Sequence, residues 1–572
     1  MLRFYKAEIY YFILFLTFLF PAYSFSSSSL VPTNRHQVYL HFSGKVVDSH
    51  GERVNDAEVN IYIDHKLVKT LLTQEEGLFL ANIPIKGSFS HVQVEVFKPS
   101  FKKVVFTLEK EKFLKHGKDF LYYKEFHLKR KLSPAFWLST IIFVLAYILI
   151  GFELLHRTIA ALLGASLMLL ISYTIGTLNP EYHILTYEAA IKSIDLNVIF
   201  LLMGMMIIIG VLKHTGVFQW CAYMTYRFAK GNVYLLTIYL IIFTAFVSAF
   251  LDNVTTMLLL TGVAIEICRA IGINPLSMLM PLILASNIGG TATLIGDPPN
   301  ILIGSYAKLT FLEFVEALAP ICVICVIVLF IYTKLVWGKE YSESKIEDVD
   351  DYIKNLRLKY RITDKKLLSY GLGVLVFVIF LFLTESIWHM EVCIAALFGA
   401  ALLATIAIVM DRIDLIELIE KDIEWPTLMF FIFLFMLVAA VESTGLLDMV
   451  ADGILKLSKG NFVAACTFIL WVSAIMSAFV DNIPFTATML PIVGYLSQKI
   501  PGAGETLWWA LALGACLGGN GTLIGASANV VTIGIAESQG YRTSFGNFMK
   551  TAFPLMIITI ILSEIWLLLV RP

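Results

Sequence analysis

Long apolar runs dominate this chain from Phe136 onward. Runs of about 18 to 23 residues recur as far as Leu569, and a helix of that length crosses a hydrocarbon core of roughly 30 Å. Hydrophobic residues make up 58% of the chain and charged residues only 15%, which is not the composition of a soluble protein. The net charge is close to zero and indicates no nucleic-acid partner. We therefore expect a polytopic α-helical protein whose partner is the lipid membrane.

The N-terminal segment 1–25 has the order of a signal peptide or signal anchor. Arg3 and Lys6 precede the apolar stretch "IYYFILFLTFLF", and Pro21 and "AYSFSSSS" follow it. Residues 35–131 should therefore be exported. They alternate in the manner of strands, as in "AEVNIYID" and "HVQVEVFK", and predict a small extracytoplasmic β-sandwich domain whose partner is unknown. Since this domain carries no glycosylation sequence, the leader favours a bacterial inner membrane.

The second half of the chain repeats the first. "SAFLDN" at Ser248 to Asn253 recurs as "SAFVDN" at Ser477 to Asn482, and 481 minus 252 gives an offset of 229. The same offset maps Gly289-Gly290 onto Gly518-Gly519 and "TLIG" onto "TLIG". We assign a transmembrane repeat to 134–337 and another to 366–570. The lysine- and arginine-rich stretch 338–365 between them should be a cytoplasmic linker.

Each repeat contains five spans and one candidate re-entrant hairpin. An odd number of crossings turns the second repeat over, and inverted repeats of this kind usually build secondary transporters with a site near the midplane of the membrane. The piece from Val233 to Ala270 could be a hairpin or two further spans. Charge alone does not separate these alternatives, so the number of spans before Gly338 is left open.

Two polar breaks interrupt each repeat. One is "FLDNVTTMLLL" with its partner "FVDNIPFTATML", and the other is "SNIGGTATLIGDPPN" with its partner "CLGGNGTLIGASAN". Broken backbone is tolerated at membrane depth only where it is buried in protein or lines a wet cavity, so the four breaks should meet. An aspartate at a helix centre costs roughly 2.5 to 3.5 kcal/mol on insertion scales, and the matched pair predicts a bound cation, a proton or a polar cavity.

These motifs resemble the ion-transporter superfamily that contains NhaD-type sodium/proton antiporters and the melanosomal P protein, with arsenite-efflux and citrate or dicarboxylate transporters as more distant members. The resemblance covers about residues 134 to 570. It implies two re-entrant hairpins whose tips form the site together with two broken helices, and commonly a homodimer. The dicarboxylate branch has serine where this chain has the two aspartates. That departure favours the antiporter branch.

The resemblance and the motif positions together give the candidate ion and substrate site. Asp252 and Asp481 are the candidate sodium ligands at the two tips. The full set of candidates is Asp252, Asn253, Thr255, Asn287, Gly289, Gly290, Thr293, Asp297, Asn300, Asp481, Asn482, Gly518, Gly519, Asn520, Thr522 and Asn529. Asp297 has no twin, because "GDPPN" becomes "GASAN" in the second copy.

Other readings of the same residues stay open. Asp252 and Asp481 could be N-caps of the returning helices, and Asp297 could cap a helix or make a turn. Lys213 and Glu442, which are equivalent by the repeat, suit the ends of spans better than a proton relay.

We predict a transporter rather than an enzyme, with sodium or lithium exchanged for protons at the paired aspartates. The coupling ions would be H⁺ and Na⁺, with no other cofactor, and the substrate a small inorganic ion. The alternative is an anion, arsenite or dicarboxylate transporter of the same fold. A receptor or scaffold with the β-domain as its working part is a third possibility, which has no need of duplicated polar breaks.

Overall fold

The computed structural model describes residues 38–343 and 360–569, apart from short gaps at 49–50, 52, 75, 86–87, 117 and 153. The predicted leader 1–25 and residues 344–359 of the predicted linker 338–365 lie outside the described residues. The chain divides into two compact units, Met1–Arg130 and Lys131–Pro572.

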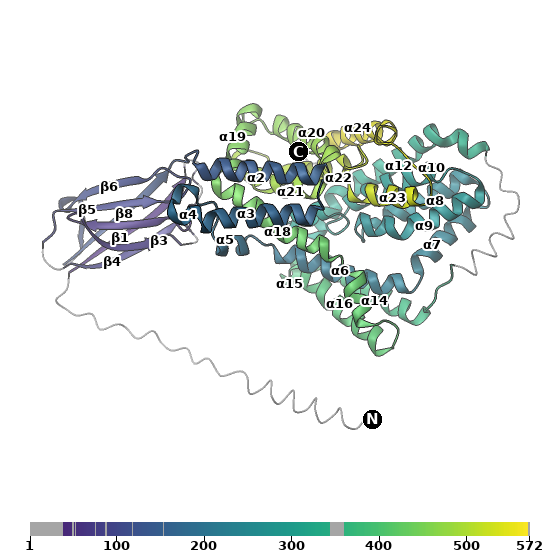
Figure 1. Ribbon diagram of the computed structural model, residues 1–572, viewed down its shortest axis with the longest axis horizontal. Coiled ribbons are helices and arrows are strands. Elements are labelled where there is room, and N and C mark those ends of the chain that lie inside the picture. Colours follow the sequence, from purple (N-terminus) through teal and green to yellow (C-terminus); the bar gives the residue numbers. More distant parts are fainter. Residues whose placement is uncertain are drawn as a thin grey trace, which may run out of the picture. The chain divides into compact units, whose positions relative to one another are not determined.

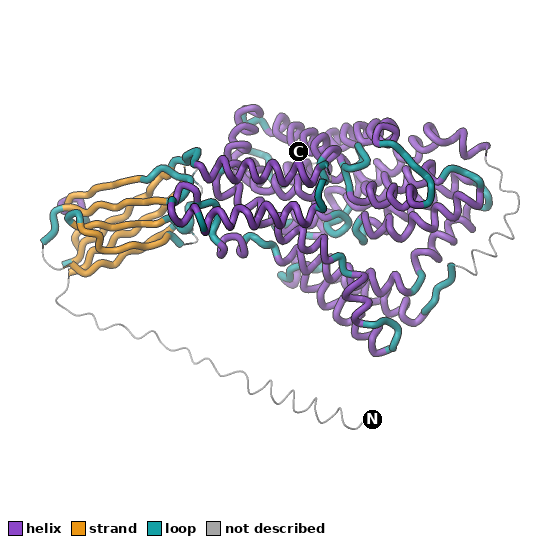
Figure 2. Tube along the Cα trace, viewed as in Figure 1, coloured by secondary structure: helices purple, strands orange, loops and turns teal. Residues whose placement is uncertain are grey.

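The first unit contains two four-stranded sheets, drawn in orange in Figure 2. The strands are β1 (Val38–Asp48), β2 (Glu58–Ile63), β3 (Lys66–Leu72), β4 (Leu78–Ile85), β5 (His91–Phe97), β6 (Val104–Glu109), β7 (Leu114–His116) and β8 (Asp119–Leu128). Their orders are β4-β1-β8-β7 and β3-β2-β5-β6. β1 pairs with β8 in parallel and with β4 antiparallel, whereas every pairing in the second sheet is antiparallel.

The two sheets share one apolar core. Leu40 and Phe42 of β1 and Val92 and Val94 of β5 alternate with more exposed neighbours, and all four are fully buried in a single cluster. Alternate residues of a strand point to opposite faces of its sheet, so the two inner faces must pack together. The predicted small β-sandwich is thereby confirmed.

The second unit is helical, and its first half runs to Glu343 (Figure 1). Its helices are α2 (Pro134–Gly151), α3 (Arg157–Tyr173), α4 (Ile175–Leu178), α5 (Tyr187–Lys192), α6 (Leu196–His214), α7 (Val217–Ala229), α8 (Val233–Ser248), α9 (Asn253–Ile271), α10 (Pro275–Thr291), α11 (Pro298–Ala307) and α12 (Phe311–Glu343).

The second half begins at Lys365. Its helices are α14 (Lys365–Leu383), α15 (Glu385–Trp388), α16 (Val392–Val409), α17 (Leu415–Glu417) with the π-helical turn Leu418–Asp422, α18 (Trp425–Thr444), α19 (Leu446–Ser458), α20 (Phe462–Phe479), α21 (Asn482–Lys499), α22 (Thr506–Gly518), α23 (Ser527–Ser538) and α24 (Phe545–Leu569).

The sequence repeat is also a structural repeat. Helices α6, α7, α8, α9 and α11 begin 229 residues before α18, α19, α20, α21 and α23, respectively. Packing is duplicated as well: α8 packs on α10 as α20 packs on α22, and α2 on α3 as α14 on α16. Contacts between the halves come in matched pairs, α6 with α16 and α18 with α3, and α9 with α23 and α21 with α11.

Ten helices of the described residues are long and apolar enough to cross a membrane, five in each half. They are α2, α3 with α4, α6, α9, α12, α14, α16, α18, α20 and α24. The predicted polytopic α-helical class is therefore confirmed. Because α9 and α20 each belong to one of the expected hairpins, length alone does not decide which helices cross. Re-entrance, and the opposite orientation of the halves that depends on it, stay predictions.

The helices end at the polar motifs. α8 turns into α9 at residues 249–252, and α20 turns into α21 at residues 480–481. The pairs α10–α11 and α22–α23 are separated by residues 292–297 and 519–526, respectively. The two turns and the two loops hold the candidate site.

Candidate functional site

The first tip, between α8 and α9, carries Asp252 as the N-cap of α9. Its Oδ1 accepts a hydrogen bond from the Thr255 backbone N–H at 3.0 Å, and its Oδ2 accepts one from Thr255 Oγ1 at 2.5 Å. Both donors belong to α9 itself, so the capping geometry is present. Within the described residues no cationic side chain pairs with Asp252.

The second tip, between α20 and α21, carries Asp481 in the equivalent place. Its Oδ1 accepts a hydrogen bond from the Ile483 backbone N–H at 3.0 Å, which again is a cap. Its Oδ2 differs, because it lies 3.2 Å from Arg157 Nη1 and accepts a hydrogen bond from Ser527 Oγ at 2.9 Å. Asp481 is therefore a paired carboxylate, whereas Asp252 is not.

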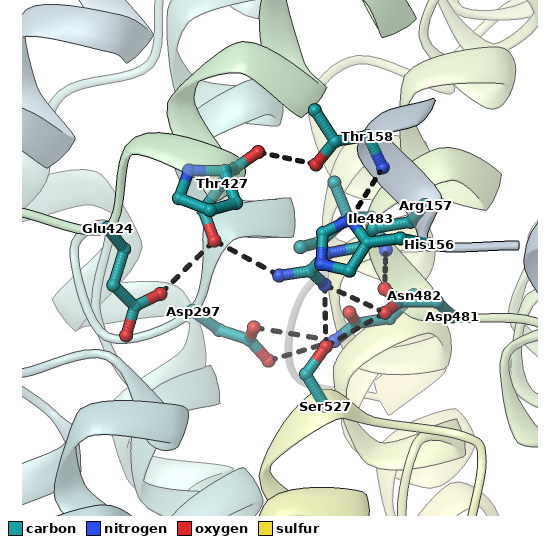
Figure 3. Close-up of polar contacts among 11 residues, drawn as sticks. His156, Arg157, Thr158, Asp297, Glu424, Thr427, Asp481, Asn482, Ile483 and Ser527 are labelled. Carbon is teal, nitrogen blue, oxygen red and sulfur yellow. Dashed lines mark hydrogen bonds and ion pairs between the residues drawn. The ribbon is translucent and has the colours of Figure 1, made fainter. Parts of the chain in front are cut away.

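Arg157, the first residue of α3, is held from several sides (Figure 3). Its Nη1 also donates to Ser527 Oγ at 2.6 Å, and its Nη2 donates to Thr427 Oγ1 at 3.2 Å. The guanidinium lies 5.3 Å from the centre of the Phe430 ring. Thr427 Oγ1 in turn donates to Glu424 Oε2 at 3.1 Å, so the network ends on a second carboxylate.

Asp297 connects the two repeats. It stands before α11 and is almost fully buried, yet its side chain makes no cap hydrogen bond to that helix. Instead, Asn482 Nδ2 of the second tip lies 3.3 Å from each of its oxygens (Figure 3). The equivalent position in the second copy is Ala526. The extra carboxylate of the first copy thus contacts the tip of the second.

Helix N-termini converge on this region. Asp252, Asp297, Glu424 and Asp481 stand immediately before α9, α11, α18 and α21, respectively. The positive end of a helix dipole favours a nearby negative charge by about 0.3 to 1 kcal/mol, and by up to about 2 kcal/mol in partly buried sites. The helix ends therefore offset part of the cost of keeping these carboxylates inside a helical protein.

Two adjoining cavities border the tips. A cleft of about 620 Å³ is lined by residues that include Arg157, Asp481 and Ser527. A much smaller pocket of about 20 Å³, which has room for about one water molecule, is lined by residues that include Asp252 and Asp297. Both cavities are bordered by Arg157, Val254, Glu424, Thr427 and Ser527. The unpaired aspartate faces the small pocket, and the paired one faces the large cleft.

Threonine and asparagine side chains tie the loops to the tips in both copies. Thr293 Oγ1 donates to the Ala249 carbonyl, and Thr522 Oγ1 donates to the Ala478 carbonyl. Asn300 Nδ2 donates to the Thr293 carbonyl at 2.8 Å, as Asn529 Nδ2 does to the Thr522 carbonyl at 2.9 Å. The side chains of these four predicted residues therefore bind backbone carbonyls and fix the shape of the loops and tips.

The four predicted glycines allow close packing. A Cβ on Gly289 would collide with the Ala245 carbonyl oxygen of α8, and a Cβ on Gly518 would lie 2.6 Å from Ala474 Cα of α20. Gly290 and Gly519 likewise face the carbonyls of Gly296 and Gly525 in their own loops, at 2.6 and 3.0 Å from an added Cβ. The glycines bring backbones together and are absent from the linings of the two cavities.

Buried asparagines link the halves beneath the tips. Asn253 Nδ2 donates to Asn287 Oδ1 at 3.1 Å. Asn287 Nδ2 donates to Asn520 Oδ1 at 2.9 Å and to Asn529 Oδ1 at 3.1 Å. Among the described residues Asn520 Nδ2 finds no acceptor, which leaves one buried donor in this chain of amides.

The structure thus brings Asp252, Asn253, Asp297, Asp481 and Asn482 to the two cavities. The sequence did not single out Arg157, Glu424, Thr427 or Ser527. Arg157 and Glu424 each precede an apolar run, where charge is ordinarily interfacial, and hydroxyls such as Thr427 and Ser527 are common in membrane helices. One signal was available: Ser527 replaces Pro298 where "GASAN" replaces "GDPPN".

Within the described residues no group of three or more His, Cys, Asp or Glu side chains is arranged to hold a metal ion. A cation at either tip would therefore be completed by amide, hydroxyl or main-chain oxygens. Oxygen ligands of these types suit hard cations.

The sequence and the fold are similar to those of known transporters. The family model described as "Citrate transporter" matches residues 147–514. The uncharacterized transporter Mb2703 of Mycobacterium bovis is 40% identical over 74% of this chain and 96% of its own length. The human P protein is 34% identical over 77% of this chain, which spans 61% of that longer protein.

Two solved structures share the fold at low identity. The YdaH transporter of Alcanivorax borkumensis superposes with a TM-score of 0.52 at 13% identity, over 72% of this chain and 98% of its own. MtrF of Neisseria gonorrhoeae superposes with a TM-score of 0.50 at 12% identity, over 75% of this chain and 97% of its own. The resemblance to the ion-transporter superfamily is confirmed: this chain belongs to the citrate transporter family and is a multi-pass secondary transporter of that class.

Proposed function

We propose that this protein exchanges a small monovalent cation, sodium or lithium, for protons. The observation that carries the proposal is the unpaired Asp252 carboxylate at the pocket of about 20 Å³. Asp297 and Glu424 border the same pocket, and Arg157, the only guanidinium or ammonium among its lining residues, pairs with Asp481. The pocket is therefore lined by a surplus of acidic over basic side chains.

Such a surplus inside a helical protein favours uptake of a proton or a small cation. Both compete for one carboxylate, so neither can occupy Asp252 while the other is bound. If the site opens to alternate sides of the membrane, this competition couples the outward movement of one ion to the inward movement of the other.

The experiment uses proteoliposomes loaded with a pH-sensitive dye. External Na⁺ or Li⁺ should dissipate an acid-inside proton gradient, and Asp252→Asn should lower the rate of that response on the order of 100-fold. Asn retains the capping role, so loss of transport in a protein that melts like the wild type would be due to the missing charge. Unchanged exchange in Asp252→Asn would contradict the proposal.

Anion transport is a second candidate, favoured by Arg157. Its guanidinium borders the cleft of about 620 Å³, and a guanidinium is the donor group best suited to a carboxylate. The family description names citrate, and the MtrF structure is reported as illuminating a class of antimetabolite efflux pumps. Uptake of radiolabelled citrate, without any effect of Na⁺ or Li⁺ on the proton gradient, would favour this candidate.

A further inference from the structure

The two aspartates that the repeat makes equivalent have different electrostatic partners. Asp481 is paired with Arg157 at 3.2 Å, and both side chains are partly buried, with 15% and 21% of their surfaces exposed, respectively. Among the residues that the structure describes, Asp252 receives hydrogen bonds only from Thr255 of its own helix. We propose that Arg157 is a tethered counter-cation, which occupies Asp481 in the ion-free protein and must be displaced before a coupling cation can bind there.

The guanidinium is well placed for this role because it is fixed independently of Asp481. It lies over the Phe430 ring of α18 and donates to Thr427 Oγ1 of the same helix. Next to it, Thr158 Oγ1 of α3 donates to the Pro426 carbonyl, which joins α3 to the first turn of α18. Since α3 and α18 hold Arg157 without the aspartate, the positive charge stays at the cleft when the ion pair opens.

The groups on the other side of the ion pair belong to different helices. Asp481 caps α21, and Ser527 begins α23. The hydrogen bonds from Arg157 to these two residues therefore join α3 and α18 to the second tip and the second broken helix. A cation bound to Asp481 would take the place of Arg157 and so break the ion pair that holds these two groups of helices together. Ion binding would thereby release one group from the other.

The first copy has no counterpart of this device. In the repeat, α16 corresponds to α3, which places Val392 at the position equivalent to Arg157, Val198 at that of Thr427, and Pro298 at that of Ser527. None of these side chains is cationic, and none can donate a hydrogen bond. One tip therefore has an internal cation and the other depends on an external one.

The inference rests on the proposed function, in that the displacing ion is taken to be Na⁺ or Li⁺. It is tested by thermal unfolding of the purified full-length protein in detergent, titrated with NaCl or LiCl against choline chloride at constant ionic strength. Arg157→Gln removes the charge but keeps hydrogen-bond donors. We expect the Na⁺ concentration for half-maximal stabilisation to fall by about tenfold or more, because Na⁺ no longer competes with a guanidinium.

Two further variants serve as controls. Arg157→Lys retains a competing charge, so its half-saturating Na⁺ concentration should stay closer to that of the wild type. Adding Asp481→Asn to Arg157→Gln should remove the gain in affinity. Arg412→Gln is the matched control, because it also breaks an arginine–aspartate pair, Arg412 Nε to Asp364 Oδ2 at 3.0 Å, away from both cavities. It should leave the titration unchanged.

The outcomes separate this inference from the proposed function. If Arg157→Gln binds Na⁺ more tightly but wild-type vesicles show no cation-driven proton movement, the tethered cation stands and the antiport proposal fails. If vesicles exchange Na⁺ for H⁺ but Arg157→Gln leaves the half-saturating concentration unchanged or raises it, the tethered cation alone is wrong. If neither protein responds to Na⁺ or Li⁺, both are wrong. Stabilisation of the wild type by citrate that is lost in Arg157→Gln would instead make Arg157 an anion-binding residue.

Discussion

The two tips have the same backbone scaffold and different chemistry. In the first, Ser248 Oγ donates to the Ser286 carbonyl at 2.7 Å, and in the second, Ser477 Oγ donates to the Ala515 carbonyl at 2.5 Å. The aspartates cap their helices alike, but only Asp481 meets an arginine. Duplication has preserved the residues that hold main chain, while those that set the local charge have diverged between the copies.

The divergence is concentrated at a few equivalent positions. Asp297 in the first copy corresponds to Ala526 in the second, and Asn287 corresponds to Cys516. Through Asn482 and Asn529, respectively, Asp297 and Asn287 both reach across to the second copy. The candidate site between the two halves is therefore asymmetric, with an unpaired aspartate at the first tip and an arginine-paired aspartate at the second.

The largest expected effect comes from removing the charge that distinguishes the first tip. Asp252→Asn should lower cation-driven proton exchange on the order of 100-fold, which corresponds to about 2.7 kcal/mol at 1.36 kcal/mol per tenfold. The melting temperature should change little, because Asn can accept the same hydrogen bond from Thr255 N–H. Initial rates in proteoliposomes and melting in detergent check both statements. If Asp252→Asn unfolds the protein and Thr255→Ala does the same, capping and not ion binding explains Asp252.

The next effect tests the shared scaffold. Gly289→Ala and Gly518→Ala should each destabilise the protein by roughly 1 to 3 kcal/mol, because the added Cβ meets main-chain atoms of α8 or α20 that cannot move aside. The controls are Gly262→Ala in α9 and Gly534→Ala in α23, whose added Cβ would meet nothing within 4 Å. Melting temperatures of the four variants give the answer. A large loss in one copy and none in the other would contradict a duplicated scaffold.

A somewhat smaller effect is expected at the loop asparagines. Among the described residues, Asn300→Ala leaves the Thr291 and Thr293 carbonyls without a donor and Asn529→Ala leaves the Gly519 carbonyl without one, at a cost of about 1 to 3 kcal/mol. Both changes also weaken contact between the halves, since Asn529 accepts a hydrogen bond from the Asn287 amide and Asn300 accepts one from the Cys516 thiol, a weaker donor. The Asn529 change should therefore cost more. Thermal unfolding with the same detergent and salt measures both, and equal losses would show that the amide bond adds no more than the thiol contact.

The sequence predicted the features that repeat along the chain. It could not predict contacts between residues that are far apart in the sequence. Apolar runs, strand alternation and the offset of 229 residues gave both folds and the positions of the breaks, since periodicity and chain continuity determine them. Arg157 is 324 residues from Asp481 along the chain, and its contact depends on how α3 packs against α18 and how the second tip meets both. A single sequence contains no measure of that proximity. The glycines were predicted as members of the site. Their role in packing could be recognised only from the structure, which shows the helices that face them.

The smallest expected effect is a change in stability at the cleft of the first copy, which can be compared with the larger cleft beside the second tip. The first copy borders a cleft of about 250 Å³, lined by residues that include Leu294, Ile301 and Glu385 but by none of either tip. Because α16 corresponds to α3, Glu391-Val392 of this cleft stands where the larger cleft has His156-Arg157. The counterpart of a cationic entrance is therefore an acidic one.

Glu385 lies between the spans α14 and α16, and its Oε1 accepts a hydrogen bond from Phe311 N–H at 2.6 Å. Burial raises its pKa from 4.5 to about 7, a rise that the Phe311 N–H opposes and that Glu313 and Glu391 reinforce. The folded state then holds its proton more tightly than the unfolded chain, so stability is lost as the pH rises from about 4.5 to about 7 and is level above that. Glu385→Gln should remove this component, on the order of 1 kcal/mol, whereas Glu391→Gln should retain most of it, because Glu391 is the smallest of the causes named. Melting temperatures of the wild type and of Glu385→Gln between pH 5 and 8 measure this component. If the wild type gained stability relative to Glu385→Gln as the pH rises, the burial of the Glu385 carboxyl at the smaller cleft would be contradicted.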